Sequence, residues 1–285
     1  NSKNVTDTVK RHVQLVIAHQ TYGNKKFGEE ADRDVRSLLW KYRSYPISLV
    51  VDFDADTAQP HLKKALARFL FAEYKTGVVL HFASILFEVN PDYQNGHPEE
   101  NMLRITEVLP RCFPLVLGEA KPRPPGLKTQ GKAGNQLGAL RFAEGHYLQM
   151  MDANMGAFFG EACKVPFVLR RFQPAGSDRR TVQARIIGFR EHIYTCRQGT
   201  VGSAMADAEW SFGTICQRFL SGLNARMHYG HPDFFDAFWA SNRGSVSKAS
   251  PAINLSEDIF AGFNVLMRGE RSKHVDYLEW EKGRE

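Results

Sequence analysis

The sequence predicts an α/β fold in which helices flank a mixed central sheet. Residues 13–22 are rich in β-forming side chains, and residues 47–54 form an apolar run of strand length. Between them, residues 28–45 carry apolar side chains at helical spacing, namely Val35, Leu38, Leu39 and Tyr42. A strand, a helix and a second strand in this order predict a parallel pair whose carboxyl ends form a crevice suited to a nucleotide.

Carboxylates follow the second predicted strand. Asp52, Asp54 and Asp56 stand at its end, where an acidic side chain can accept a hydrogen bond from a ribose hydroxyl or a uracil imide. A polar turn without any ligand explains the same residues, so both interpretations stay open.

The next segments predict a helix and a hairpin. Residues 59–75 form an amphipathic helix, which we expect to be an insertion that packs rather than performs chemistry; its apolar face carries Leu62, Ala65, Leu66, Phe69 and Leu70. Residues 78–89 and 102–109 are separated by a turn-rich segment and predict an antiparallel pair of strands.

Composition limits the partners. The net charge is +6, from 37 basic and 31 acidic residues, which favours a polyanion such as a nucleoside diphosphate, an anionic membrane surface or nucleic acid. No known nucleic-acid-reading motif is present. No apolar run reaches the roughly 18–20 residues that cross a bilayer. The four cysteines lack zinc-finger spacing and are expected to be reduced structural thiols.

The C-terminal sixty residues are dense in charge, histidine, glycine and aromatic side chains. Glu257 and Asp258 follow Ser256, a plausible N-cap, at the start of an amphipathic helical pattern. A helix dipole there would keep carboxylates ionised, which suits a general base or an acceptor for sugar hydroxyls. Helix capping alone is the alternative. The many basic residues in the same part of the sequence favour a functional site over capping alone. They are Arg226, Arg243, Lys248, Arg268, Arg271, Lys273 and Arg284.

Three sequence motifs in this block resemble those of a known family. They are HYGHPD at 228–233, RGSVSKASPAINLSEDIFAGFN at 243–264 and KGR at 282–284. They resemble the catalytic region of the 1,3-β-glucan (callose) synthases, glycosyltransferase family 48, in wording closer to the plant type than to the fungal type. The resemblance continues upstream over nearly the whole chain, through FREHIYT at 189–195, LQMMDAN at 148–154 and HQTYG at 19–23.

The resemblance implies a GT-A-like glycosyltransferase domain. We expect one catalytic domain over 1–285, with a nucleotide-binding half at 1–115 and a catalytic half at 116–285. The chain lacks an initial Met and stops directly after KGRE, inside a motif that should continue, so we expect a segment of a longer multi-pass membrane protein whose catalytic domain faces the cytosol at the plasma membrane. A Rho-type GTPase is the regulator that the resemblance suggests.

The implied reaction is inverting transfer of glucose from UDP-glucose to a growing 1,3-β-glucan chain. Asp258 is the expected base and Glu257 orients the acceptor, while Lys132, Arg226 and Lys248 would stabilise the departing UDP. The expected substrate-binding residues are Gln20, Tyr22, Asp54, Lys121, Asn135, Gln136, Asp152, Glu191, His228 and His231.

Two lysines compete for the diphosphate. The family has one short glycine-rich turn, whereas here Lys121 matches its beginning and Lys132 its end, with a proline-rich insertion between them. Lys132 is favoured because its spacing to Asn135 and Gln136 is intact. A linker with stray basic residues remains the alternative.

A metal ion is left open rather than implied. Asp152 is expected after an alternating strand at 147–151 and before a helix that starts near Asn154, a position that suits Mg²⁺ or a donor contact. His228 and His231 have His-x-x-His spacing, but Gly230 and Pro232 favour turn packing over zinc.

Two other functions fit parts of the sequence. The first is an inactive, synthase-derived UDP-sugar-binding or regulatory segment, in which the split lysine loop has abolished turnover. The second is a hydrolase using Glu257 and Asp258, but adjacent residues cannot readily flank a bond at the roughly 5–10 Å separation that such enzymes use.

Overall fold

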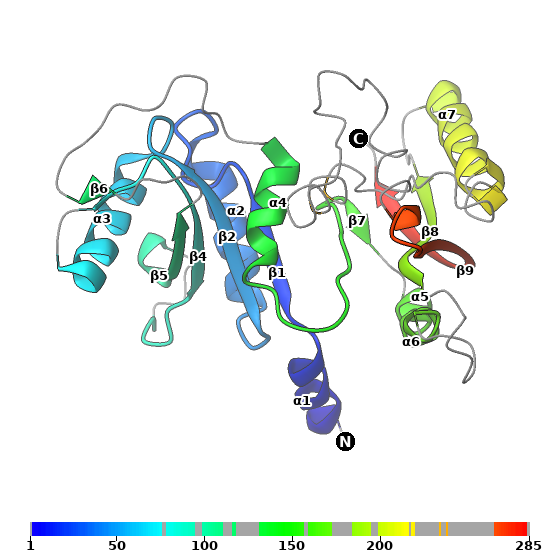
Figure 1. Cartoon of the computed structure of the whole chain (residues 1–285), viewed down its shortest axis with the longest axis horizontal. Coiled ribbons are helices and arrows are strands. Elements are labelled where there is room, and N and C mark those ends of the chain that lie inside the picture. Colours follow the sequence, from blue (N-terminus) through cyan, green and yellow to red (C-terminus); the bar gives the residue numbers. More distant parts are fainter. Residues whose placement is uncertain are drawn as a thin grey trace. The chain divides into compact units, whose positions relative to one another are not determined.

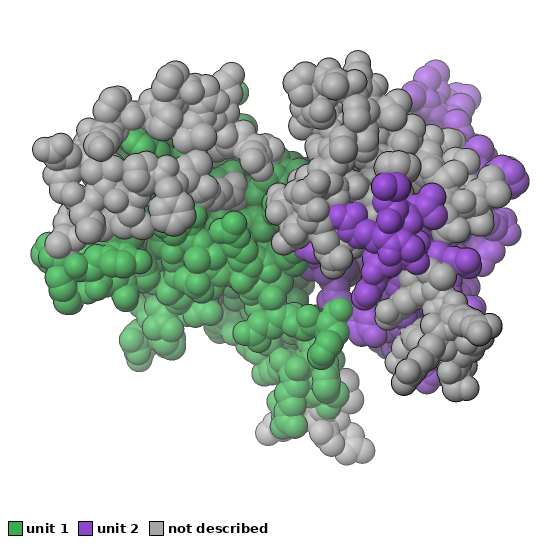
Figure 2. All heavy atoms as spheres, viewed as in Figure 1, with its two compact units in different colours: residues 1–146 green, residues 147–285 purple. Residues whose placement is uncertain are grey.

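The computed structural model describes most of the chain and divides it into two compact units. The described residues are 2–75, 78–94, 99–110, 116–117, 131–156, 159–172, 184–194, 199–216, 218–219, 234, 238 and 265–283. Unit 1 comprises residues 1–146 and unit 2 residues 147–285 (Figure 2).

Unit 1 is built on a four-stranded mixed sheet in the order β1-β2-β4-β5 (Figure 1). Its strands are β1 (Leu15–His19), β2 (Ile47–Asp54), β4 (Phe82–Val89) and β5 (Leu103–Pro110). β1 and β2 are parallel, whereas β4 is antiparallel to both β2 and β5. The predicted parallel pair and hairpin are therefore confirmed.

Four α-helices accompany this sheet within the described part of unit 1. They are α1 (Ser2–His12), α2 (Gly28–Lys41), α3 (Pro60–Tyr74) and α4 (Gly131–Leu140), with a 3₁₀ turn, η1 (Glu100–Met102), and the paired strands β3 (Val78–Val79) and β6 (Val116–Leu117). α3 begins at Pro60, whose fixed φ suits a first helical position, and ends before Lys75 at φ 58°. The helices predicted near 28–45 and 59–75 are confirmed.

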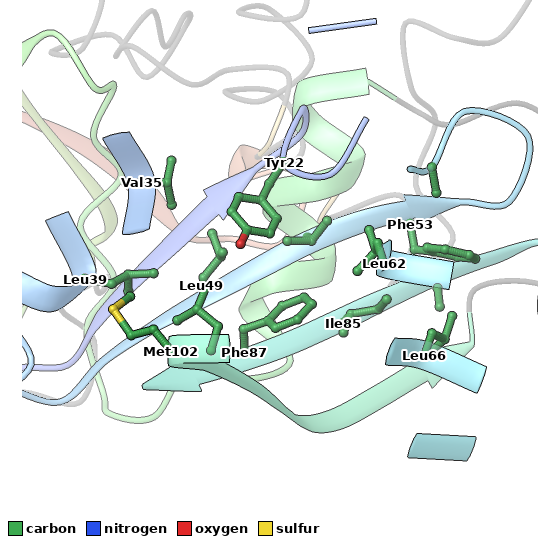
Figure 3. Packing of buried hydrophobic residues seen from close by; sticks show 14 of the residues in the cluster. Tyr22, Val35, Leu39, Leu49, Phe53, Leu62, Leu66, Ile85, Phe87 and Met102 are labelled. Carbon is green, nitrogen blue, oxygen red and sulfur yellow. The ribbon is translucent and has the colours of Figure 1, made fainter. Parts of the chain in front are cut away.

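The two faces of the sheet pack against different helices because strand side chains alternate. On one face, Leu49, Val51 and Phe53 of β2 pack with α2 and α3 in the main core (Figure 3). On the other face, Val50 packs with Ala139 of α4 and with Phe142. A fully buried side chain such as Leu49 stabilises the fold by about 1.5–3 kcal/mol.

The buried face of α2 differs from the expected one. Leu38 and Tyr42 are exposed, whereas Asp32 and Arg36 lie on the inner face with Val35 and Leu39. These four residues follow i, i+3, i+4, i+7 spacing, which defines one helix face. Two charged side chains thus occupy positions where the sequence pattern leads one to expect apolar residues.

Unit 2 contains a three-stranded sheet in the order β7-β9-β8. Its described elements are β7 (Met155–Gly156), α5 (Phe159–Ala162), α6 (Val165–Arg170), β8 (Ala184–Tyr194), α7 (Gly199–Ser211), a π-helical turn, η2 (Phe212–Cys216), and β9 (Arg271–Gly283). β8 and β9 are parallel, and Val168, Val275 and Leu278 form the local core.

The prediction around Asp152 is wrong. Residues 147–151 form no strand, and no helix starts near Asn154; β7 follows at Met155 and the next helix begins only at Phe159. The alternating side chains Tyr147 and Met151 are exposed, so the alternation has no buried face to support a strand.

Candidate functional site

The carboxyl ends of β1 and β2 form one edge of the unit 1 sheet. β1 leads into a loop over residues 20–24, and β2 leads into residues 55–59. The two loops bond to each other, because the Gln59 N–H donates to the Gly23 carbonyl at 2.6 Å and the Lys25 N–H donates to the Thr57 carbonyl at 2.9 Å. The edge is therefore a connected backbone surface rather than two separate loops.

Helix α4 is fastened to this edge by Asn135. With its amide oxygen turned toward the loop, Asn135 accepts hydrogen bonds from the N–H groups of His19 and Gln20, both at 3.2 Å. Its side chain is buried, with 2% of the residue exposed. The structure thus brings together Gln20 and Asn135, two residues that the sequence singled out.

The direction of α4 follows from a second contact. Gln14, which precedes β1, donates to the Phe142 carbonyl at 3.1 Å and accepts the Glu144 N–H at 2.7 Å. Since Asn135 meets the end of β1 and residues 142–144 meet its beginning, α4 runs antiparallel to β1. Its first turn lies at the carboxyl edge.

That first turn carries Lys132. Lys132 is exposed and precedes Asn135 and Gln136 by three and four residues, which places the three side chains on one side of the helix. Gln136 is half-buried and Gln20 is exposed. The ammonium group of Lys132 and the side-chain amides of Gln136 and Gln20 therefore lie at the edge where β1 ends.

Asp52 and Asp54 place two carboxyl groups on the same sheet face. They alternate with the apolar residues of β2 and share the side of Val50, which α4 covers. Asp52 is buried opposite Ser84 of β4, and half-buried Asp54 accepts the Asp56 N–H at 2.9 Å. Asp54 is the more open of these two carboxylates.

Tyr22 lies inside the core instead of on an open surface. It is 5% exposed, and its ring centroid is 6.0 Å from that of Phe87 and 6.4 Å from that of His19. The Tyr22 ring thus packs into the main core and anchors there the loop that carries it (Figure 3).

The structure adds residues that the sequence reasoning missed. Asp32 of α2 is 1% exposed, and both of its carboxylate oxygens accept the Gly23 N–H at 3.0 Å. Burial raises the pKa of Asp32, opposed by the Gly23 N–H and by Arg36, His19 and His61. Burial also lowers the pKa of His19, opposed by Asp32. One sequence feature could have revealed Asp32: together with Arg36, it falls on the same helix face as the apolar residues Val35 and Leu39.

In unit 2, Glu191 is half-buried on β8 between Arg190 and His192, two residues that share the Glu279 carboxylate. Arg190 Nη2 lies 3.3 Å from Glu279 Oε2, and His192 Nδ1 lies 3.0 Å from Glu279 Oε1. The Glu279 N–H in turn donates to Glu161 at 2.9 Å. Because strand side chains alternate, Glu191 projects to the side opposite Arg190 and His192.

Asp152 does not gather metal ligands. It is half-buried in an irregular segment, and its N–H faces the Met155 sulfur at 3.2 Å. Across the described ranges, no group of three histidine, cysteine or acidic side chains could hold a metal ion.

Unit 2 also has a pocket of about 420 Å³ that the sequence did not indicate. It is lined by Phe167, Arg170, Arg171 and Tyr277. Each guanidinium lies over a ring, at 5.7 Å for Arg170 with Phe167 and 5.9 Å for Arg171 with Tyr277. The lining is thus cationic and aromatic.

The remaining predicted site residues lie outside the described part of the chain. They are the carboxylates Glu257 and Asp258, the cations Lys121, Arg226 and Lys248, and the histidines His228 and His231. The amphipathic pattern after Asp258 also lies largely there. Among the helices that are described, none is long and apolar enough to cross a bilayer.

Comparison with known proteins gives a consistent result. A family model described as "1,3-beta-glucan synthase component" matches residues 124–285. Putative callose synthase 6 of Arabidopsis thaliana is 36% identical over 276 residues, covering 95% of this chain and 12% of the relative. Callose synthase 11 of the same plant is 42% identical over 272 residues, covering 95% of this chain and 13% of the relative.

A fungal relative agrees. The "1,3-beta-glucan synthase component" of Cordyceps militaris is 32% identical over 229 residues, covering 71% of this chain and 12% of the relative. The chain spans only about an eighth of the length of these relatives. By both kinds of comparison, this chain belongs to the 1,3-beta-glucan synthase family.

Proposed function

We propose that this chain forms part of the catalytic domain of a 1,3-β-glucan synthase that transfers glucose from UDP-glucose with inversion. The observation that carries the proposal is the carboxyl edge of β1 and β2, where Asn135 joins α4 to the loop after β1 and Lys132 occupies the first turn of α4. Ligands of α/β sheets bind at such edges, and a GT-A-like arrangement places its sugar nucleotide there.

The edge offers groups that suit a uridine diphosphate. Asp54 is a half-buried carboxylate at the end of β2 that would accept from a ribose hydroxyl or the uracil imide, and exposed Gln20 supplies an amide directly after β1. Lys132 is an exposed ammonium that would neutralise the diphosphate. Lys132 is better supported in this role than Lys121, because its helix is bonded to the same loop that carries Gln20.

The proposed chemistry needs one base. The acceptor 3-hydroxyl oxygen attacks the anomeric carbon from the face opposite UDP while Asp258 takes the hydroxyl proton. The bond from the anomeric carbon to the phosphate oxygen breaks, and UDP departs with that electron pair. Lys132, with Arg226 and Lys248, would stabilise the charge that develops on the leaving oxygen, and Glu257 would orient the acceptor.

The rest of the proposed assembly belongs to the longer protein. The acceptor is a glucan chain, and the site would face the cytosol at the plasma membrane. Membrane spans would lie in parts of the protein beyond this chain, and a Rho-type GTPase would regulate it.

The test is synthesis by the full parent protein in membranes supplied with UDP-glucose. We expect a polymer that 1,3-β-glucanase digests. Asp258→Asn should lower kcat by about 10²–10⁴-fold, the usual contribution of a positioned base. Donor binding without polymer in the wild type would contradict turnover, and full activity of Asp258→Asn would contradict the assignment of the base.

A further inference from the structure

Two buried polar side chains from different helices hold the backbone of the loop after β1. Asp32 of α2 accepts the Gly23 N–H with both carboxylate oxygens at 3.0 Å. Asn135 of α4 accepts the N–H groups of His19 and Gln20 at 3.2 Å. Three backbone donors within five residues are therefore bonded to side chains that are themselves almost fully buried.

Gly23 explains why the loop needs such support. Its φ is +67°, a conformation that favours glycine, and a Cβ there would lie 2.6 Å from Leu62 Cδ2. Its carbonyl also accepts the Gln59 N–H at 2.6 Å. The turn at Gly23 is thus fixed on several sides, and the exposed Gln20 belongs to the same loop.

Burying the Asp32 carboxyl group to hold this loop has an unfavourable free energy. Removing an ionised carboxylate from water is unfavourable, and burial accordingly raises the pKa of Asp32 despite its hydrogen bonds and nearby cationic groups. Stability alone would be served as well by a neutral side chain in the core. A buried carboxyl group that fixes a loop at the carboxyl edge of a sheet is what pre-organisation of a binding site requires.

We propose that Asp32 and Asn135 are positioning residues, which hold the Gln20–Gly23 backbone in the geometry that receives the donor nucleotide. The role rests on the proposed function, since it assumes that UDP-glucose binds at this edge. Neither side chain touches the donor itself, because they are 1% and 2% exposed.

The test measures KM for UDP-glucose and kcat separately in the full parent protein. Asp32→Asn keeps the shape of the side chain but removes one acceptor oxygen and the charge, and the matched control is Asp34→Asn, at an exposed position of the same helix. We expect Asp32→Asn to raise KM by about tenfold with kcat within about twofold, as expected for one lost charge-assisted hydrogen bond. Asp34→Asn should change neither value.

A second variant keeps the proposal falsifiable if Asp32→Asn fails to accumulate. Asn135→Leu removes the acceptor for His19 and Gln20, and it should also raise KM more than it lowers kcat. Combined with Asp32→Asn, it should raise KM by less than the product of the two single effects, because both act on one loop.

The outcomes separate the two proposals. If the wild type makes glucan and each variant keeps its KM while melting at a lower temperature, the two residues are only structural and the positioning role is wrong. If the wild type neither binds UDP nor makes glucan, the proposed function itself fails, and the positioning role fails with it.

Discussion

Lys132 and Asn135 are one helical turn apart and have opposite surroundings. Lys132 is exposed at the edge of the sheet, whereas Asn135 is buried against the backbone of His19 and Gln20. The buried amide fixes the turn, and the fixed turn gives the backbone of Lys132 a defined place. Its side chain remains exposed at that edge.

The first prediction concerns the choice between the two lysines. Lys132→Gln should lower kcat/KM for UDP-glucose by about 10²–10³-fold, the usual loss when one stabilising group for developing charge is removed. Lys121→Gln is the matched control and should change it by less than about threefold. Glucan synthesis by parent protein in membranes measures both. The reverse ranking of the variants would assign the diphosphate to Lys121.

Single residues differ in how well the sequence predicts them. Gln20 and Asn135 were singled out by motif, and the structure joins them through the loop backbone. Asp32 was missed because a carboxylate on a helix ordinarily indicates a solvated face. Only the contact with Gly23, which belongs to another element, reveals its position.

At the scale of elements, α2 shows how a sequence pattern can predict a helix and misplace its face. Adjacent Leu38 and Leu39 both fit an apolar stripe, yet Leu38 is 41% exposed and Leu39 is 0% exposed. The inner face instead includes Asp32 and Arg36. The helix is turned so that Asp32 reaches the loop after β1.

The second prediction uses these adjacent leucines. Leu39→Ala should lower the free energy of unfolding by about 2–5 kcal/mol, because it leaves a cavity in the core of unit 1. Leu38→Ala should cost less than about 1 kcal/mol, as is usual for exposed positions. Urea unfolding measures both. Equal losses would mean that α2 presents a different face to the sheet.

Long periodic elements were predictable and β9 was not. The patterns of β1, α2, β2 and α3 are local, and the structure confirms each element. β9 is rich in charge, and its pairing with β8 shifts register between Phe189 and Arg190, so no simple alternation survives in its sequence. Its partner is also distant in the chain, a contact that local propensity does not encode.

At the scale of the whole molecule, each compact unit contains a half-buried histidine whose protonation would destabilise the fold. Burial lowers the pKa of His19 in unit 1 and of His274 in unit 2 below the ordinary value of 6.5, opposed by Asp32 and Asp276 respectively. Arg218 and Arg190 lower the pKa of His274 further. Both rings therefore favour the neutral form in the folded chain.

The third prediction follows from this sign. A group whose pKa is depressed in the fold contributes stability that is present above its unfolded pKa of 6.5 and is lost as the pH falls through its lower folded pKa. The free energy of unfolding should therefore decline on acidification below about pH 6.5. Asp32 acts in the opposite sense nearer pH 4, since its pKa is raised.

Unfolding titrations at several pH values test this linkage. His274→Gln should make the decline below about pH 6.5 shallower, whatever its effect on absolute stability. The control is His146→Gln, at an exposed position. The same slope in wild type and His274→Gln would show that this ring does not resist protonation in the fold.

The site itself depends on a contact between distant parts of the chain. α4 belongs to the first compact unit because it packs on β1 and β2, and no local pattern predicts which sheet face a helix far along the sequence will cover. The sequence singled out Gln20, Lys132 and Asn135 one by one, whereas their place at one edge of the sheet required the fold.

Hydrogen exchange of the parent protein with and without UDP tests the central claim most directly. If the carboxyl edge of β1 and β2 holds the donor nucleotide, UDP should slow backbone exchange in residues 20–24 and 131–136 and leave α3 unchanged. Unaltered exchange in both of those segments at a saturating concentration of UDP would contradict it.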